Sequence, residues 1–520
     1  MEDTVTKNVS PIYNLNRDLL WVIFTMNADI FSNMSALPDT RHASQVCQIW
    51  REIILDGPSL WGRLIALDHL GQEKDDWRNE VMRRAQNSLL WVHGDVTGNR
   101  DDPRPSWTFF ISLLANHWNR IQRLVVDVAP VDVNDPRWQA MLQPAPHLET
   151  FKVRFLKFRR EDGLLFSAIS GDRSLFANHA PSLREIDATK ISFALRAPWT
   201  SNLRTISLSS PFTLPLIFGA LKEMPLLEHL NFDSLEPVMG ESLSFPRVNL
   251  PRLIELKVEG YLHICNTILD HITPGPGCSL SLRATDRSDT TLTDEVLTDT
   301  GKPLSQYLTN FYQVHSPKRI SLQYVYRDFR FSDNTYPSGQ GYPFFIVFIQ
   351  LTSKATARPG FPRFLKAFIS DYFAAVQILD FHVLNIPLLL RPACLSILAA
   401  FPSVEAMNTE EYCLKFLVET AAEVFIPHLL PALHTVKLPQ ISMPLSESDA
   451  AMPLINFLNF RKDAGFPIKV LDISKMEVQP LGHFGPILDQ DMAGMIVLFK
   501  RGKEVKEVVC GSNRVTRLFL

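Results

Sequence analysis

Four side chains of the types that bind zinc lie within a short stretch of the chain. They are His263, Cys265, His271 and Cys278. A structural zinc site needs four ligands at about 2.0–2.3 Å, and its ligands usually come in close pairs such as CxxC or HxxxH. The four residues show no such pairing, so the sequence predicts no metal site. Cys265 lies in an apolar segment and is expected to be a small buried hydrophobic residue.

Other patterns for catalysis or phosphate binding are also missing from the sequence. Gly339-Gln340-Gly341 has no third glycine and neither follows a strand pattern nor precedes a helical one, which argues against dinucleotide binding. The chain has no GxSxG, no HExxH and no Walker-type lysine loop. We therefore predict a protein that is not an enzyme and uses no cofactor. The alternative is an enzyme whose residues converge in the irregular region 284–370.

Length and composition narrow the class of protein further. The 520 residues carry a formal net charge of −3, which creates no field to attract nucleic acid or an anionic membrane, so neither is expected as a partner. The six cysteines are scattered without a CxxC pair, as is typical of a reducing compartment. The sequence shows no signal peptide and no apolar run of about 20 residues. These features predict a cytoplasmic or nuclear location.

The first elements that could position a functional surface are helices between residues 11 and 65. Asn14 or Asn16 can cap the first helix, whose apolar stripe contains Leu19, Leu20, Ile23 and Phe24. A second helical pattern starts near Ala43 and stops at Gly57-Pro58. So short a unit has a very small core. It must either pack on the rest of the chain or offer an apolar face to a partner.

Three blocks of this segment carry a family resemblance. Residues 15–24, 45–51 and 56–61 follow the order LPxELLxxIF, VCxxW and tPxLW, which resembles an F-box, with an exit block common in the fungal F-box families. Asn16 stands where the family has proline, and the spacer between Phe24 and Val46 is longer than in the compact form. The resemblance implies that residues 11–65 bind a Skp-type adaptor of a cullin (SCF) ubiquitin ligase. By the same resemblance, the adaptor contact would be shaped by Leu15, Leu19, Leu20, Ile23, Phe24, Val46, Cys47 and Trp50.

A different pattern recurs through the rest of the chain. A six-residue kernel, apolar at positions 1, 4 and 6, occurs at residues 121–126, 148–153, 183–188, 203–208, 227–232, 253–258, 376–381, 433–438 and 468–473. Its first residue advances from 183 to 203, 227 and 253, in steps of 20, 24 and 26 residues, within the span of leucine-rich repeats. Each kernel predicts a strand with a helical return. This resembles the degenerate leucine-rich repeats often found after an F-box.

These patterns predict an α/β fold with an N-terminal three-helix F-box and an irregular leucine-rich-repeat-like solenoid. The expected domains are a disordered N-terminus at 1–10, the F-box at 11–65, a linker or solenoid cap at 66–118, the solenoid at 119–475 with the irregular region 284–370, and a C-terminal cap at 476–520. Residues 500–520 are expected to form a strand pair that closes the solenoid, and the alternative is a basic docking tail.

Residues between the buried kernel positions should point to the opposite face of the sheet. The face carries mixed charges and no aromatic platform, which favours a target protein over nucleic acid. The predicted target-binding residues are Lys152, Arg154, Asp187, Asn231, Asp233, Lys257 and Glu259. The alternative is a solvated sheet face without a partner.

Together these features predict the substrate-recognition subunit of an SCF-type ubiquitin ligase. Its N-terminal helices would bind the adaptor and its repeats would bind an unknown target protein. The alternative is a leucine-rich-repeat interaction scaffold with no ligase role.

Overall fold

The structure is a computed structural model of a mixed α/β protein whose main sheet is mostly parallel. It describes residues 15–71, 74–97, 105–129, 136–156, 174–187, 191, 193–210, 212–235, 245–285, 293–337, 341–351, 359–424, 429–439, 453–477, 484–501 and 503–512. The predicted disordered segment 1–10 lies outside these residues. The chain divides into two compact units, Met1–Pro246 and Arg247–Leu520.

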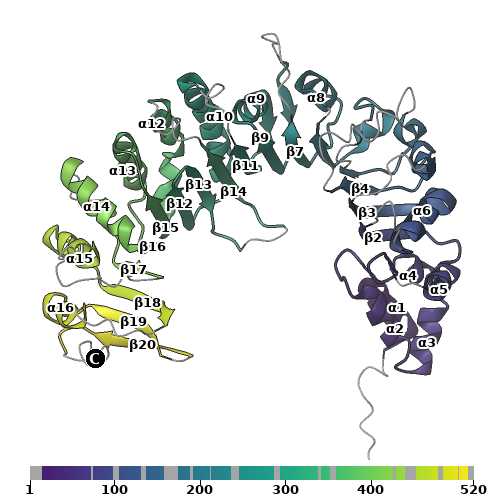
Figure 1. The fold of residues 1–520 in the computed structure, drawn as a ribbon, viewed down its shortest axis with the longest axis horizontal. Helices are drawn as coiled ribbons and strands as arrows, with labels where there is room; N and C mark the ends of the chain where they lie inside the picture. Colours follow the sequence, from purple (N-terminus) through teal and green to yellow (C-terminus); the bar gives the residue numbers. More distant parts are fainter. Residues whose placement is uncertain are drawn as a thin grey trace, which may run out of the picture. The chain divides into compact units, whose positions relative to one another are not determined.

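Unit 1 begins with short helices and continues as alternating strands and helices (Figure 1). Its helices are α1 (Arg17–Asn27), α2 (Ala36–Ala43), α3 (Gln48–Leu55), α4 (Pro58–Gly62), α5 (Asp76–Ala85), α6 (Pro105–His117) and α8 (Leu214–Leu221). Its strands are β1 (Ile65–Ala66), β2 (Leu90–Thr97), β3 (Ile121–Ala129), β4 (Thr150–Phe155), β5 (Glu185–Asp187), β6 (Thr205–Ser209) and β7 (His229–Leu235). Each strand pairs in parallel with the next one along the chain, from β1 to β7.

Unit 2 repeats this alternation with one interruption. Its strands are β8 (Val248–Leu250), β9 (Glu255–Gly260), β10 (Ile272–Pro274), β11 (Ser279–Thr285), β12 (Arg319–Val325), β13 (Asp328–Asp333), β14 (Phe345–Gln350), β15 (Ile378–Leu384), β16 (Ala406–Thr409), β17 (Thr435–Lys437), β18 (Val470–Glu477), β19 (Ile496–Arg501) and β20 (Glu504–Val509). Its helices are α9 (Leu262–His271), α10 (Asp294–Tyr312), α12 (Gly360–Leu365), α13 (Arg391–Ala399), α14 (Glu411–Val424), α15 (Pro453–Asp463) and α16 (Phe484–Asp491).

The interruption is an antiparallel meander inside the predicted irregular region. β11 pairs with β14, β14 with β13 and β13 with β12, and β12 then pairs in parallel with β15. A two-residue turn joins β12 to β13, with Tyr326 at a φ of 59°. Buried phenylalanines of β13 and β14, among them Phe331 and Phe345, anchor the meander in the core. The predicted irregular region therefore contributes three strands to the sheet of unit 2.

All nine predicted kernels form strands, and their described apolar positions are buried. In the kernels that start at 148, 183, 227, 253 and 433, the first residue donates its N–H to the carbonyl three residues earlier, at 3.0–3.3 Å. The proline at the second position of each of these turns has the φ that such turns require. In these five kernels the turn therefore ends at the first kernel residue, and the strand begins two residues later.

The ends of the chain agree with the predicted patterns in part. β19 and β20 form an antiparallel strand pair, but it begins at Ile496, before the predicted stretch 500–520, and residues 513–520 lie outside the described residues. The second predicted helix, from Ala43, is in fact the end of α2 and the whole of α3, separated at Ser44–Cys47 because Cys47 is extended. The spacer between Phe24 and Val46 contains α2.

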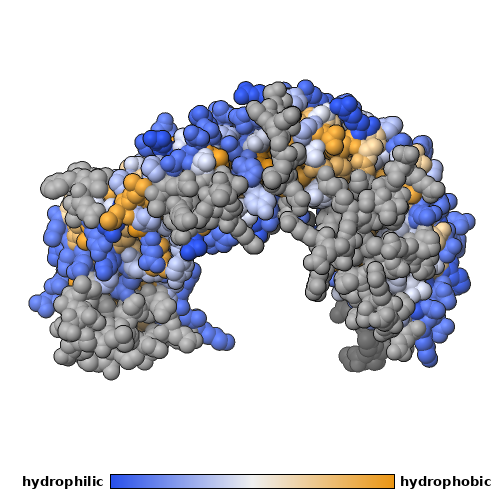
Figure 2. Space-filling view, turned by 45° about the horizontal axis from the view of Figure 1, so that its top comes forward, coloured by the Kyte–Doolittle hydropathy of each residue, from blue (hydrophilic) through white to orange (hydrophobic). Residues whose placement is uncertain are grey.

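Apolar residues on the surface are local rather than continuous. On the face drawn in Figure 2, hydrophilic residues cover much of the surface and hydrophobic ones form separate patches. Among the described residues, no helix is both long enough and apolar enough to cross a bilayer.

Candidate protein-interaction surfaces

The first candidate surface is built on α1, and its position depends on a small core. Asn16 caps the helix, with its Oδ1 accepting the N–H of Leu19 at 2.8 Å. Leu20 and Phe24 point inward and are 4% and 5% exposed. The ring of Phe24 meets that of Trp50 on α3 edge to face, with centroids 5.1 Å apart. This contact fixes α1 against α3.

The opposite side of α1 is apolar and open to solvent. Leu19, Val22, Ile23 and Met26 recur at helical spacing and are 51%, 51%, 46% and 73% exposed. Two further apolar side chains at the start of α3, Val46 and Ile49, are 63% and 53% exposed. We call these six residues the N-terminal apolar patch.

The predicted adaptor-binding residues divide into three groups in the structure. Leu19, Ile23 and Val46 lie in the patch; Leu15, Cys47 and Trp50 are half-buried; Leu20 and Phe24 are core residues that support the helices. Val22, Met26 and Ile49 belong to the patch but were not among the predicted contacts. The i, i+3, i+4, i+7 spacing from Leu19 to Met26 is the signal that identifies Val22 and Met26.

The long spacer between Phe24 and Val46 attaches these helices to the sheet of unit 1. Phe31, in the loop before α2, packs against Trp91 and His93 of β2, with ring centroids 5.8 and 5.5 Å away. The guanidinium of Arg123 on β3 lies 4.3 Å from the centre of the Phe31 ring. The main-chain oxygen of Met34 lies 3.0 Å from Nε2 of His69. The helices are therefore held in one orientation on β2 and β3.

The second candidate surface is the polar sheet face of each unit, where the predicted target-binding residues lie. In unit 1, strand register places Arg154 opposite Asp127 and Lys152 opposite Asp187. Arg154 donates two hydrogen bonds to Asp127, at 2.7 and 3.0 Å, and Lys152 forms an ion pair with Glu185 at 2.9 Å.

The remaining predicted target-binding residues are divided between unit 1 and unit 2. Asp187, Asn231 and Asp233 are half-buried, and the Asn231 amide lies 3.5 Å from the Ser207 hydroxyl. In unit 2, Lys257 pairs with Glu255, and Glu259 is exposed. Opposite charges thus match Arg154 and Lys152 from the neighbouring strand and Lys257 from its own strand. A partner would meet a polar sheet face with charges of both signs in each unit.

β14 adds apolar groups to the same face in unit 2, beside the predicted residues Lys257 and Glu259. Ile346 and Phe348 face the strand neighbours Ser281 and Arg283 and are half-buried. The Arg283 guanidinium lies 5.8 Å from the centre of the Phe348 ring. These two residues were not among the predicted ones, because the segment 344–349 is an uninterrupted apolar run, which does not reveal which side chains face outward.

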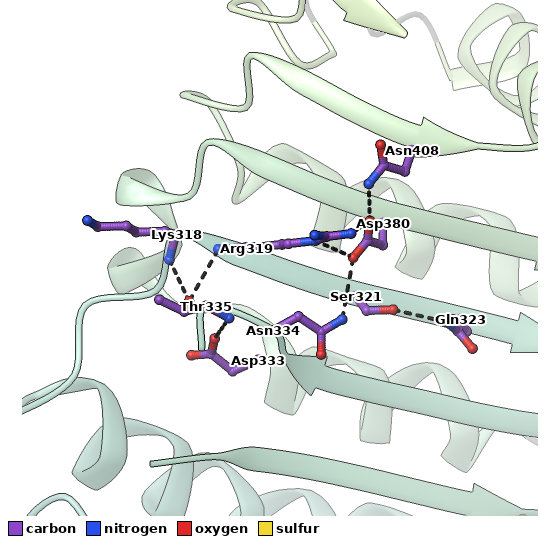
Figure 3. Close-up of polar contacts among 9 residues, drawn as sticks. All are labelled: Lys318, Arg319, Ser321, Gln323, Asp333, Asn334, Thr335, Asp380 and Asn408. Carbon is purple, nitrogen blue, oxygen red and sulfur yellow. Dashed lines mark hydrogen bonds and ion pairs between the residues drawn. The ribbon is translucent and has the colours of Figure 1, made fainter. Parts of the chain in front are cut away.

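A polar network crosses four strands near the meander (Figure 3). Asp380 of β15 is 6% exposed. Its carboxylate accepts two hydrogen bonds from Arg319, at 2.8 and 3.0 Å, one from Asn334 at 3.4 Å and a short one from Asn408. Burial alone would raise the pKa of Asp380, but the hydrogen bonds from Arg319 and Asn408 outweigh it and hold the pKa below its usual range.

The lowered pKa of Asp380 predicts a pH dependence of stability. A carboxyl whose pKa is lower in the folded state stabilises the fold above its unfolded pKa of about 3.9, and this contribution is lost as pH falls through the folded pKa. We expect Asp380→Asn to lower the free energy of unfolding at pH 7 by about 1.5–3 kcal/mol. The variant should also lose less stability than wild type on acidification below pH 4. Urea unfolding at a series of pH values would show this, and parallel pH profiles for the two proteins would contradict it.

The four residues whose types can bind zinc do not form a metal centre in the structure. Cys265 is buried in α9 and Cys278 is buried before β11, and burial raises the pKa of both thiols to about 12. Within the described parts of the chain, no group of three or more His, Cys, Asp or Glu side chains is placed to hold a metal ion. A groove beside α10, in the region where an enzyme was the alternative, has neither histidine nor carboxylate among its described lining residues.

Comparison with known proteins assigns no family. No model of a known protein family matches the chain, and no curated protein matches it at a significant level. The two surfaces are thus the features from which function can be inferred.

Proposed function

We propose that this protein is the substrate-recognition subunit of an SCF-type ubiquitin ligase. In this proposal α1–α3 form the F-box that binds a Skp-type adaptor, and the strands and helices that follow form a leucine-rich-repeat-like solenoid that binds a target protein. The observation that carries the proposal is the N-terminal apolar patch.

Each of the six patch residues is 46% exposed or more, although all six come from one short helical unit. Burying one large apolar side chain contributes about 1.5–3 kcal/mol, and exposed apolar clusters on soluble proteins commonly mark interaction sites. α1 is apolar on both sides, since Leu20 and Phe24 face the core while Leu19 and Ile23 face solvent. A helix of this kind suits a position between its own domain and a second protein.

The order of strands supports the solenoid part of the proposal. Consecutive kernels form neighbouring parallel strands, and helices or turns return the chain between them. Stacked units of this kind provide long surfaces for protein binding. In unit 2, Phe348 and Ile346 add apolar contacts that a target could bury, beside polar residues that would set its orientation.

The proposed mechanism needs no catalytic residue in this chain. The receptor raises the effective concentration of the target beside a ubiquitin-conjugating enzyme. This requires a fixed geometry between adaptor and target surfaces, and the packing of Phe31 on Trp91 and His93 supplies it within unit 1.

Binding to the adaptor tests the proposal. We expect the full chain, co-expressed with a Skp-type adaptor, to co-elute with it in size-exclusion chromatography at a one-to-one ratio. The complex should then bind cullin. Elution of the two proteins as separate species would contradict the ligase role and would favour the alternative, a leucine-rich-repeat scaffold without one.

A further inference from the structure

A groove of about 670 Å³ lies between α10 and α12 in unit 2. The two helices are neighbours (Figure 1), and α12 continues into a short 3-10 turn, Lys366–Phe368. Gly301 of α10 lies close to α12: a Cβ added there would be 3.6 Å from Cβ of Ala367 and 3.7 Å from Cα of Phe364. Gly301 and Ala367 are small residues that line the groove, and larger side chains at these positions would fill part of it.

Cations line both sides of this groove. Lys302 comes from α10, and Arg363 and Lys366 come from the opposite wall. Among the described residues, neither Arg363 nor Lys366 forms an ion pair, and no carboxylate belongs to the described lining. Lys302 contacts Asp299 at 3.3 Å, but both side chains are mostly exposed, at 76% and 57%. Such surface pairs are worth about 0–1 kcal/mol and exchange readily for another anion.

The α10 wall also carries uncharged hydrogen-bonding groups along its length. They are Thr298, Ser305, Gln306, Thr309, Asn310 and Gln313. Oδ1 of Asn310 already accepts the N–H of Gly277, and the Thr298 hydroxyl donates to the Asp294 carbonyl. Side-chain amides and hydroxyls both donate and accept, so the remaining donors and acceptors can pair with the main chain of a peptide. From residue 298 to 313 the helix rises about 22 Å. An extended peptide covers that distance with about seven residues.

We infer that this groove binds an acidic peptide segment of a partner protein. The carboxylates of the segment would pair with Lys302, Arg363 and Lys366, and its main chain would hydrogen-bond to the amides and hydroxyls of α10. The groove is formed by helices, away from the polar face of the strands, so it is a second binding site that does not depend on the ligase role.

The test uses the full-length protein and a fluorescein-labelled peptide of about seven alternating glutamate and alanine residues, whose binding is followed by fluorescence anisotropy. The same peptide with glutamine in place of glutamate is the neutral probe. We expect the glutamate peptide to bind, with an affinity that falls as salt is added, and the neutral peptide to bind much more weakly.

Charge reversal then locates the site. The double variant Lys302→Glu and Arg363→Glu should weaken binding about tenfold or more, while Lys302→Arg with Arg363→Lys should retain it. Lys222→Glu and Lys469→Glu, exposed cations elsewhere, should have little effect. The inference is overturned if the glutamate peptide does not bind, if the double reversal binds as wild type does, or if the control reversals weaken binding equally. Co-elution with the adaptor should be the same in all these variants.

Discussion

Ile23→Lys is expected to abolish adaptor binding while leaving the protein folded. Ile23 is 46% exposed in the middle of the apolar stripe of α1, so its replacement removes an apolar contact and places a charge in the proposed interface. Truncation of a central apolar anchor commonly costs about 2–4 kcal/mol of binding free energy. This corresponds to a loss of affinity of about 30- to 1,000-fold. Isothermal titration with purified adaptor would measure it.

The control for this variant comes from the same unit. Leu216 on α8 is 62% exposed, and Leu216→Lys should bind the adaptor as wild type does. Phe24→Asp is a poor test, because Phe24 is buried against Trp50 and a charge there would disturb the helices themselves. If Ile23→Lys, with an unchanged melting temperature, binds the adaptor with wild-type affinity, the N-terminal apolar patch is not the adaptor site.

The strands could be predicted from the sequence where buried apolar positions follow a turn that contains proline. Leu183, Leu227 and Leu253 each close a turn after proline and begin a buried strand, so the apolar spacing and the proline point to one structure. The same signal identifies β16, which the kernel search missed. Pro402 precedes Val404, Met407 and Thr409, all of which are buried. The kernel requires an apolar residue at the position of Thr409. Threonine can be buried there because its hydroxyl donates to the Phe381 carbonyl.

The meander could not be predicted from the same reasoning. β14 is a short apolar run and β12 alternates polar and apolar residues, but neither pattern specifies which strand pairs with it or in which direction. The order β14, β13, β12 in the sheet is set by the turn at Tyr326 and by packing of distant phenylalanines such as Phe331 and Phe373. Those contacts join residues far apart in the chain, where periodicity carries no information.

For the candidate surfaces, the sequence identified many of the residues but not their roles or their pairing. Helical spacing groups Leu19, Val22, Ile23 and Met26 on one side of α1 and Leu20 and Phe24 on the other, but it does not show which side is buried. Different roles for Phe24 and Ile23 therefore required the neighbours of the helix to be known. For the sheet face, alternation identified the outward residues, but it could not show that Arg154 would be matched by Asp127. That pairing depends on strand register.

Arg461 is a buried cation that holds α15 to the turn before β17, and its replacement is expected to have a large effect on stability. It is 2% exposed, and its guanidinium donates to the carbonyls of Leu429, Leu430, Leu433 and Phe466 at 2.6–3.1 Å. Among the described residues it forms no ion pair with a carboxylate. Burial lowers the pKa of Arg461 to about 10, so it remains charged at neutral pH.

Arg461→Met should therefore destabilise unit 2 strongly. Methionine fills part of the volume but removes the Arg461 donor from the carbonyls of Leu429, Leu433 and Phe466, while the Leu430 carbonyl keeps its bond from the Leu433 N–H. Loss of a buried hydrogen-bonding partner costs about 1–3 kcal/mol. We expect the free energy of unfolding to fall by about 3–5 kcal/mol, with faster amide hydrogen exchange at residues 429–438. Lys415→Met, at a side chain 62% exposed on α14, should change stability by less than about 0.5 kcal/mol. Equal unfolding free energies for Arg461→Met and Lys415→Met would show that water or neighbouring groups satisfy these carbonyls, and that the buried arginine does not hold the turn to α15.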